Sequence, residues 1–451
     1  MKRIGMLIYS VMTAMITLAQ SVIDVHSHII TEQFAAALES ENRLMDEGFP
    51  LPKWDAEAQL KWMDEVGIET SVLTLAAPQP SSAKVVHAAN EAAAELKAKY
   101  PGRFMFCAAL PLPNVKAAIK EAKYALDTLK ADGIKLATNV DGQYLGAPEL
   151  DTLFAFLNER KAVIILHPHR PEPVNIKVMQ QTPLAMQEYL SETTRAVSNM
   201  ISRNVLARYP NVKVVVPHCG AYLPLAVPRM KSLTPVMQAN KMVGDIDWET
   251  NLAALYYDLA GAHSPEVIRM LLTITTPDHL LYGSDYPYVA PSVLTASLGR
   301  MKQYLSAEPD LAPFRRMILE QNARWLFGLS TEKAKANTAN EQDMVVRIAE
   351  IVVYPQYMDE YLTAATQIQQ SSLEKEPGVI CLFPTQLKED SCQIRILEIY
   401  ASKEAYQHHI QADHFKKYKQ GTIHMVKFFK LQDLLPLNLQ NISNLFSRMN
   451  K

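Results

Sequence analysis

The chain lacks three features that would indicate other classes of protein. It has only four cysteines in 451 residues, and no two of them stand in Cys-x-x-Cys spacing. It has no excess of charge, since 45 Lys and Arg against 47 Asp and Glu give a formal net charge of -2. Beyond its N-terminus it has no apolar run long enough to cross a bilayer. These absences disfavour a paired-thiol motif, a nucleic-acid partner and an integral membrane protein.

The N-terminus has the layout of an export signal. Lys2 and Arg3 precede an apolar stretch over residues 4–18, and the small residue Ala19 comes just before the junction at residues 20–21. This pattern predicts a signal peptide over residues 1–20 and a periplasmic or secreted protein. An uncleaved anchor and a first domain helix are the alternatives, although the stretch is short for a span of ~20 residues.

Export would permit disulfides, so the positions of the cysteines matter. Cys107 falls within an apolar stretch and is expected to be a small buried hydrophobe. Cys381 and Cys392 lie in two predicted strands joined by a polar turn at residues 388–390. They would meet only if the strand register placed them opposite one another, which the sequence does not decide.

His26 and His28 stand two residues apart in an apolar segment. Because side chains in a strand alternate, both imidazoles are expected on the same face. Two buried imidazoles need a polar partner, and neutral imidazole is a favoured ligand of zinc and similar divalent metals. The segment therefore suggests a metal site. The alternative is a pair of surface histidines near the N-terminus.

Several later apolar runs also end on a possible ligand or on a residue able to transfer protons. Short runs rich in Val, Ile and Leu and bounded by Pro or Gly indicate strands that are buried on both faces. Three of them end near His167, His218 and Asp285. Eight candidate strands separated by helix-length stretches predict an α/β fold of the (β/α)8 TIM-barrel type over residues 21–328. The strands are expected at residues 22–26, 70–76, 104–110, 133–137, 163–167, 212–216, 254–258 and 280–285. In such a barrel these side chains meet at the carboxyl ends of the strands.

The composition changes after Gly328. Residues 329–343 are polar and predict a linker. Residues 344–436 follow the order β-α-β-β-α-β, which predicts a small ferredoxin-like α+β domain. The strands are expected at residues 345–353, 379–384, 393–400 and 422–431, and the helices at 358–371 and 403–414. Residues 437–451 show no clear role and are considered a C-terminal tail.

The second domain resembles the antibiotic-biosynthesis monooxygenase family. The similarity lies in Arg347-Ile-Ala-Glu-Ile-Val-Val-Tyr-Pro355, Glu376-Pro-Gly378, Arg395-Ile-Leu-Glu-Ile-Tyr400 and Asp413-His-Phe-Lys-Lys-Tyr418. Members commonly dimerise through their sheets, so a homodimer is expected. Some members oxidise aromatic substrates, but fold alone does not establish an activity. His409, His414 and Tyr418 are candidates for a cleft, and the alternative is that they are surface and packing residues.

The barrel resembles the amidohydrolase-related (family 2) group, which includes aminocarboxymuconate-semialdehyde, γ-resorcylate and 6-methylsalicylate decarboxylases. The similarity lies in Ile23-Asp-Val-His-Ser-His28, Gly67-Ile-Glu-Thr70, Asn139-Val-Asp-Gly-Gln-Tyr-Leu-Gly146, His167-Pro168, Pro217-His-Cys-Gly-Ala-Tyr222 and Tyr282-Gly-Ser-Asp-Tyr-Pro287. The resemblance implies that His26, His28, His167 and Asp285 hold one divalent metal ion, expected to be Zn²⁺. His218 and Asp285 would be the catalytic residues.

Six further residues are weaker candidates. Asp24 shares a strand face with His26 and His28, and would be an extra ligand or an acceptor that orients an imidazole. The others would reach the substrate, receive its carboxylate or bridge a second metal; they are His169, Arg170, Arg195, Arg229 and Lys135. Ordinary loop, surface or strand positions are the alternative for each of them. A bridging lysine is not expected, because this group usually holds one metal.

The family resemblance favours a metal-dependent decarboxylase of a small aromatic or unsaturated carboxylate. A metal-dependent hydrolase of a lactone, amide or ester would use the same five residues. An inactive barrel with an assembly role is a third possibility, although every expected ligand position is filled. The expected partner is a small-molecule carboxylate or lactone, with no nucleic acid and no membrane contact beyond export.

Overall fold

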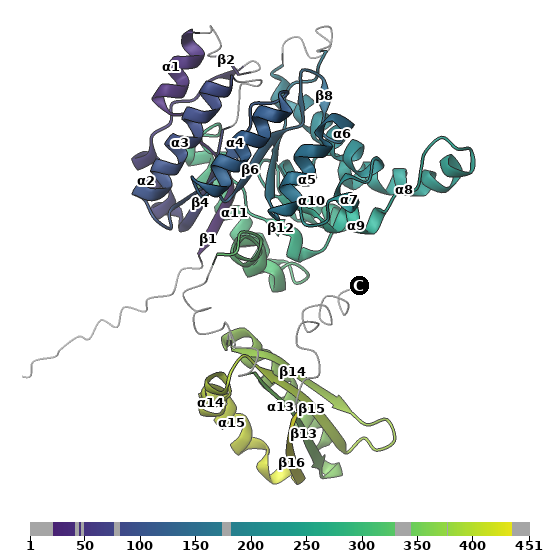
Figure 1. The fold of residues 1–451 in the computed structure, drawn as a ribbon. Coiled ribbons are helices and arrows are strands. Elements are labelled where there is room, and N and C mark those ends of the chain that lie inside the picture. Colours follow the sequence, from purple (N-terminus) through teal and green to yellow (C-terminus); the bar gives the residue numbers. More distant parts are fainter. Residues whose placement is uncertain are drawn as a thin grey trace, which may run out of the picture. The chain divides into compact units, whose positions relative to one another are not determined.

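The computed structural model describes residues 21–40, 45–46, 49–75, 82–173, 182–329, 344–376 and 378–434. The chain divides into two compact units, Met1–Leu329 and Ser330–Lys451 (Figure 1). The predicted signal peptide, the tail, and all of the predicted linker except Leu329 lie outside the described residues. Among the helices that the structure describes, none combines the length and apolar character needed to cross a bilayer.

The first unit contains an eight-stranded parallel sheet that curves into a barrel. Its strands, in spatial order, are β1 (Val22–His28), β4 (Ile68–Thr74), β5 (Phe104–Ala109), β6 (Gly133–Ala137), β9 (Val163–His167), β10 (Lys213–Val216), β11 (Leu255–Asp258) and β12 (Leu280–Leu281). The barrel closes where the Val25 N–H donates to the Tyr282 carbonyl at 3.0 Å. A parallel bridge between Ser27 and Tyr286 continues this contact. The predicted (β/α)8 architecture is confirmed.

Helices surround this barrel and connect its strands (Figure 1). They are α1 (Glu32–Ser40), α2 (Ala56–Val66), α3 (Ala83–Lys99), α4 (Val115–Asp127), α5 (Asp151–Glu159), α6 (Glu188–Ser202), α7 (Val205–Arg208), α8 (Leu223–Ala239), α9 (Trp248–Ala253), α10 (Pro265–Leu271), α11 (Pro291–Ala307) and α12 (Asn322–Leu326). Side chains of Asp55, Ser82 and Asn114 cap the first turns of α2, α3 and α4. The connections also hold the short strand pairs β2 (Met45–Asp46) with β3 (Phe49–Pro50), and β7 (Asn139–Val140) with β8 (Gln143–Tyr144).

The second unit is an antiparallel sheet with helices, in the order β14-β15-β13-β16. Its elements are β13 (Val345–Val353), α13 (Met358–Lys375), β14 (Val379–Gln386), β15 (Gln393–Tyr400), α14 (Lys403–Gln411), α15 (Asp413–Thr422) and β16 (Val426–Leu434). This order confirms the predicted ferredoxin-like domain.

Several predicted boundaries in this unit were wrong, and two of the differences change the organisation of the elements. The single helix expected at residues 403–414 is two helices, because Ala412 adopts an extended conformation between α14 and α15. The last strand begins at Val426 rather than residue 422, because α15 continues to Thr422. The Thr422 hydroxyl donates a hydrogen bond back to the Tyr418 carbonyl at 2.8 Å.

The four cysteines are free. Cys107 is buried in β5, as predicted. The register of β14 and β15 pairs Cys381 with Ile399, so Cys392 does not lie opposite it. The possible pairing of Cys381 with Cys392 is therefore not formed.

Candidate metal centre

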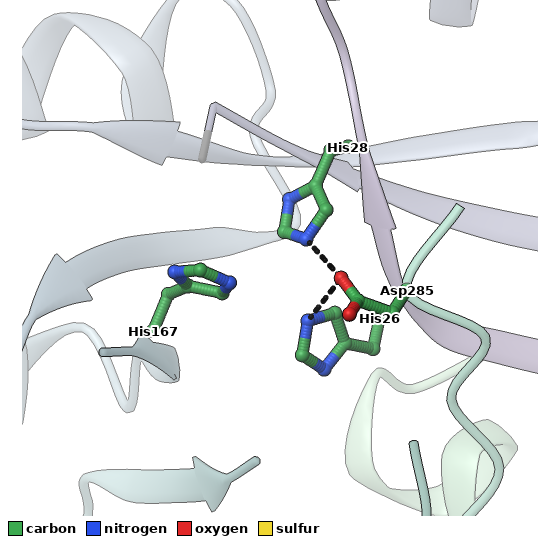
Figure 2. Close-up of side chains that lie close together, drawn as sticks. All are labelled: His26, His28, His167 and Asp285. Carbon is green, nitrogen blue, oxygen red and sulfur yellow. Dashed lines mark hydrogen bonds and ion pairs between the residues drawn. The ribbon is translucent and has the colours of Figure 1, made fainter. Parts of the chain in front are cut away.

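The four predicted metal ligands converge at the carboxyl ends of the barrel strands. His26 and His28 come from β1, His167 ends β9, and Asp285 follows β12. One possible ligand atom from each lies within 4.8 Å of those of the others. The Oδ1 atom of Asp285 is 3.0 Å from His28 Nε2 and 3.5 Å from His26 Nε2 (Figure 2). The three imidazoles are buried, whereas Asp285 is 22% exposed.

Hydrogen bonds on the outer side of the cluster set the tautomers of two histidines. His167 Nδ1 lies 3.0 Å from the Pro168 carbonyl, which can only accept, so this nitrogen carries the hydrogen. His28 Nδ1 lies 3.0 Å from the Thr74 hydroxyl, which donates its own hydrogen to the Ser27 carbonyl. His28 Nδ1 is therefore a donor as well. Both rings turn an unprotonated Nε2 toward the centre of the cluster, as a metal requires.

His26 is held by Asp258, a residue that the sequence reasoning missed. His26 Nδ1 lies 2.8 Å from Asp258 Oδ2, and both side chains are buried. Burial lowers the pKa of His26, but the charge and hydrogen bond of Asp258 raise it more, to about 9. His26 Nε2 is buried and has no hydrogen-bond partner. A cation bonded to this nitrogen would satisfy it, so the site fits a divalent metal.

Asp258 also positions His218. Its Oδ1 atom accepts hydrogen bonds from the backbone N–H groups of His218 and Ala260, both at 3.1 Å. The His218 backbone adopts the left-handed conformation, with φ of 54°. A positive φ is uncommon for a residue with a side chain, and such residues concentrate at functional sites. Asp258 ends a strand that the sequence predicted. Because the functional side chains of a barrel lie at the carboxyl ends of its strands, this position could have identified Asp258 as a site residue.

His218 lies beside the ligand cluster and outside it. Its ring centroid is 5.1 Å from that of His26 and 6.0 Å from that of His167. Its Nδ1 atom is buried without a hydrogen-bond partner. Burial lowers the pKa of His218, so the ring is neutral at neutral pH. A neutral imidazole next to a metal site is suited to transferring a proton.

Asp24 orients the segment that carries Asp285. It accepts from the Ser284 N–H at 3.0 Å and from the Ser284 hydroxyl at 2.6 Å. Asp24 does not belong to the ligand cluster and contacts no imidazole ring, so both of its proposed roles were wrong. Asp24 instead supports Asp285 indirectly, through Ser284. Next to this contact, the Asp285 N–H donates to the His26 carbonyl at 2.8 Å. Burial raises the pKa of Asp24 to about 7.

Gly283 allows β12 to approach β1 closely. A Cβ atom at this position would lie 2.7 Å from His26 Cβ and 3.2 Å from Asp258 Cβ. The first distance is too short for two carbon atoms. The glycine in the predicted Gly283-Ser-Asp285 motif is therefore a packing requirement of the metal site.

Comparisons with known proteins agree with this geometry. Residues 23–329 match the family profile described as Amidohydrolase. The chain belongs to the amidohydrolase family. Residues 344–421 match the profile described as Antibiotic biosynthesis monooxygenase. Both resemblances predicted from the sequence are confirmed.

Two relatives and one solved structure are named decarboxylases. Decarboxylase macB of Penicillium terrestre is 32% identical over 311 residues, covering 64% of this chain and 90% of the relative. The 6-methylsalicylic acid decarboxylase acuB of Aspergillus aculeatus is 28% identical over 328 residues, covering 70% and 98%. A dihydroxybenzoic acid decarboxylase from Polaromonas sp., solved with bound manganese and 2-nitroresorcinol, has a TM-score of 0.58 at 19% identity, covering 70% and 98%. At that identity the structure supports the fold alone.

In this family member a cavity of about 620 Å³ opens onto the metal centre. His167, His218 and Asp285 line it beside one another. Much of the remaining described lining is apolar, including side chains of Met186, Leu190, Leu225, Val267, Met270 and Val289. Within the described lining there is no lysine or arginine. The cavity therefore suits a largely apolar ligand with one anionic end.

The three arginines considered for a substrate carboxylate do not line this cavity. Arg170 forms an ion pair with Glu172 at 2.6 Å, and Arg195 pairs with Glu192. Arg229 is exposed on α8. The surface alternative given for these residues holds, because each side chain lies at an acidic neighbour or in solvent. His169 and Lys135 are buried, but neither lines this cavity or joins the ligand cluster.

Proposed function

We propose that the barrel is a metal-dependent decarboxylase of a small aromatic carboxylate. The observation that carries the proposal is the convergence of three imidazoles and Asp285 at the end of a largely apolar cavity. The two relatives named above are decarboxylases, and one of them acts on 6-methylsalicylic acid. This is also the reaction that the sequence favoured over hydrolysis.

The apolar walls would hold the aromatic ring while its carboxylate faces the ligand cluster. His26, His28, His167 and Asp285 would bind the metal, and each histidine is kept in place by a hydrogen bond at Nδ1. When bound, the metal would supply positive charge that offsets the negative charge of the substrate carboxylate. No described cationic side chain in the cavity competes for that carboxylate.

Of the two predicted catalytic residues, His218 would handle the proton that decarboxylation consumes, and Asp285 would serve as a metal ligand. A proton is added to the ring carbon that bears the carboxylate, the bond to that group breaks, its electron pair returns to the ring, and carbon dioxide leaves. Burial raises the pKa of Asp285, but the neighbouring imidazoles of His28, His26 and His218 together lower it to about 2, so Asp285 stays ionised as a ligand. We assign proton transfer to His218, whose Nδ1 has no other partner. Its neutral ring would first take up a proton from water and then pass that proton to the ring carbon.

The test measures carbon dioxide release from 6-methylsalicylate and related hydroxybenzoates, beside a panel of lactones. His218→Asn should keep about one equivalent of barrel metal and lose turnover. His26→Ala and Asp285→Ala should lose both. His87→Asn is the matched control, since His87 pairs with Glu121 on the outer helices. Ring opening of a lactone without gas release would instead support the hydrolase, and full turnover of His218→Asn would remove His218 from the mechanism.

We propose zinc as the metal, since three imidazoles and one carboxylate are ligands that zinc accepts. Manganese, which the Polaromonas protein holds, is the competing metal. Elemental analysis of protein purified without chelator, followed by activity after reconstitution with each metal, distinguishes them.

We also propose a homodimer formed through the second unit. Cross-strand pairs place Phe383, Phe428 and Leu434 on the face of the sheet opposite α13. They are 45%, 48% and 41% exposed, which is unusual for large apolar side chains on one surface. Light scattering should give a dimer for the wild type and a smaller species for Phe428→Asp.

Export stays a proposal based on the layout of residues 1–20. Cell fractionation with N-terminal sequencing of the mature protein tests it. A mature protein that begins within residues 19–22 supports export, and one that retains Met1 in the cytoplasm contradicts it.

A further inference from the structure

We propose that the second unit contains another divalent-cation site, formed by Glu376, His409 and His414. The three residues come from separate elements: Glu376 follows α13, His409 lies in α14, and His414 lies in α15. One carboxylate oxygen and one nitrogen from each imidazole lie within 4.8 Å of one another. Two histidines and one glutamate form a donor set that occurs in catalytic zinc and non-haem iron sites.

The cluster is buried and convergent. Glu376 is 3% exposed and His409 is 2% exposed, whereas His414 is 21% exposed. Both imidazoles approach the same carboxylate oxygen, since Glu376 Oε1 lies 2.9 Å from His409 Nδ1 and 2.6 Å from His414 Nε2. In the barrel site, two imidazole nitrogens converge on one oxygen of Asp285 in the same manner.

The hydrogen bonds of the cluster occupy the atoms that a metal would use. A cation would take the place of the hydrogens in these two contacts. Each imidazole would then carry its hydrogen on the other ring nitrogen.

A groove adjoins the cluster. It has a volume of about 360 Å³ and is lined by residues of α13 and α15, among them His414, Lys417 and Tyr418. His414 therefore belongs both to the cluster and to the groove. Three protein ligands leave a position open on a tetrahedral cation, as catalytic sites do. A small anion with oxygen donors is the class of ligand that would fill this position beside Lys417.

The test uses the full-length, untagged protein and Co²⁺ alone as the probe. The double variant His26→Ala/His28→Ala removes the barrel site, so that binding to the second unit can be counted by equilibrium dialysis and by visible absorption. This protein should bind about one equivalent of Co²⁺. Adding Glu376→Gln or His414→Asn should weaken binding by more than about tenfold.

The matched control is His424→Asn in the same double variant. His424 lies in the same unit, against the Tyr357 ring and outside the cluster, so its loss should leave Co²⁺ binding unchanged. Circular dichroism verifies folding, and the partly exposed His414 provides the test if Glu376→Gln does not fold.

Two results would overturn the proposal. The first is a double variant that binds no Co²⁺, which would mean that the cluster only ties α14 and α15 to the start of β14. The second is binding that Glu376→Gln and His414→Asn weaken no more than His424→Asn does.

Discussion

At the scale of single residues, Asp258 has the widest influence on the metal centre. One carboxylate oxygen fixes the ring of the ligand His26, and the other holds the backbone of His218. Asp258→Asn should weaken metal binding by about tenfold to a hundredfold, because an amide is a poorer partner for a ligand imidazole. Competition with a chromophoric chelator measures this affinity. The control is Asp310→Asn, an exposed partner of Arg269, and equal affinities in the two variants would contradict the role of Asp258.

The protonation of His26 gives metal binding a defined pH dependence. Because its metal-free pKa is raised to about 9, His26 is charged at pH 7 and must lose a proton to become a ligand. Metal affinity of the barrel site should therefore rise by about tenfold per pH unit from pH 7 to near 9, then level off. Calorimetry in buffers of different ionisation enthalpy should detect about one released proton at pH 7. Binding without proton release at that pH would show that His26 is neutral.

At the scale of elements, the close contact between β12 and β1 depends on Gly283. Gly283→Ala should displace His26 and Asp258 and reduce metal affinity by at least about tenfold, because the added Cβ would overlap with His26 Cβ. Gly299→Ala in α11 is the control, since nothing lies within 4 Å of a Cβ there. That change should raise the free energy of unfolding by about 0.5–1 kcal/mol through helix propensity. Unchanged metal affinity in Gly283→Ala would show that β12 can move away without harm.

The strands were predictable because parallel strands that are buried on both faces are short apolar runs. Four of the five predicted site residues also lie at or near the ends of these runs. The segment before Asp285 was less predictable. The apolar run suggested a strand over residues 280–285, whereas β12 ends at Leu281 and Asp285 has a φ of 68°. That conformation depends on contacts with Asp24 and His26, which are distant in the sequence.

At the scale of the whole molecule, the two units should respond separately to loss of the barrel metal. Ligand binding to the folded state alone stabilises by about 4 kcal/mol at a thousandfold excess over Kd. In calorimetric scans with saturating Zn²⁺, the first unit should therefore unfold at a lower temperature in His26→Ala/Asp285→Ala than in the wild type. The transition of the second unit should be the same in both proteins. A shared shift of both transitions would show that the units unfold together.

The division into two units and their folds followed from local patterns, but the walls of the cavity did not. Met186, Leu225 and Met270 come from the connections and helices that follow different strands, and only the closed barrel brings them together. For the same reason, the sequence could not decide whether the three arginines face the cavity. Arg195, for example, lies in a helical pattern that does not reveal its pairing with Glu192.

The uneven distribution of polar groups in the cavity has a consequence for turnover. A hydroxybenzoate would be anchored by its carboxylate at the metal held beside His167, His218 and Asp285, while its ring rests on thioether and aliphatic side chains. Decarboxylation removes this charged group and leaves a neutral phenol, which contacts the cavity mainly through apolar side chains. The product is therefore expected to bind more weakly than the substrate, which favours its release.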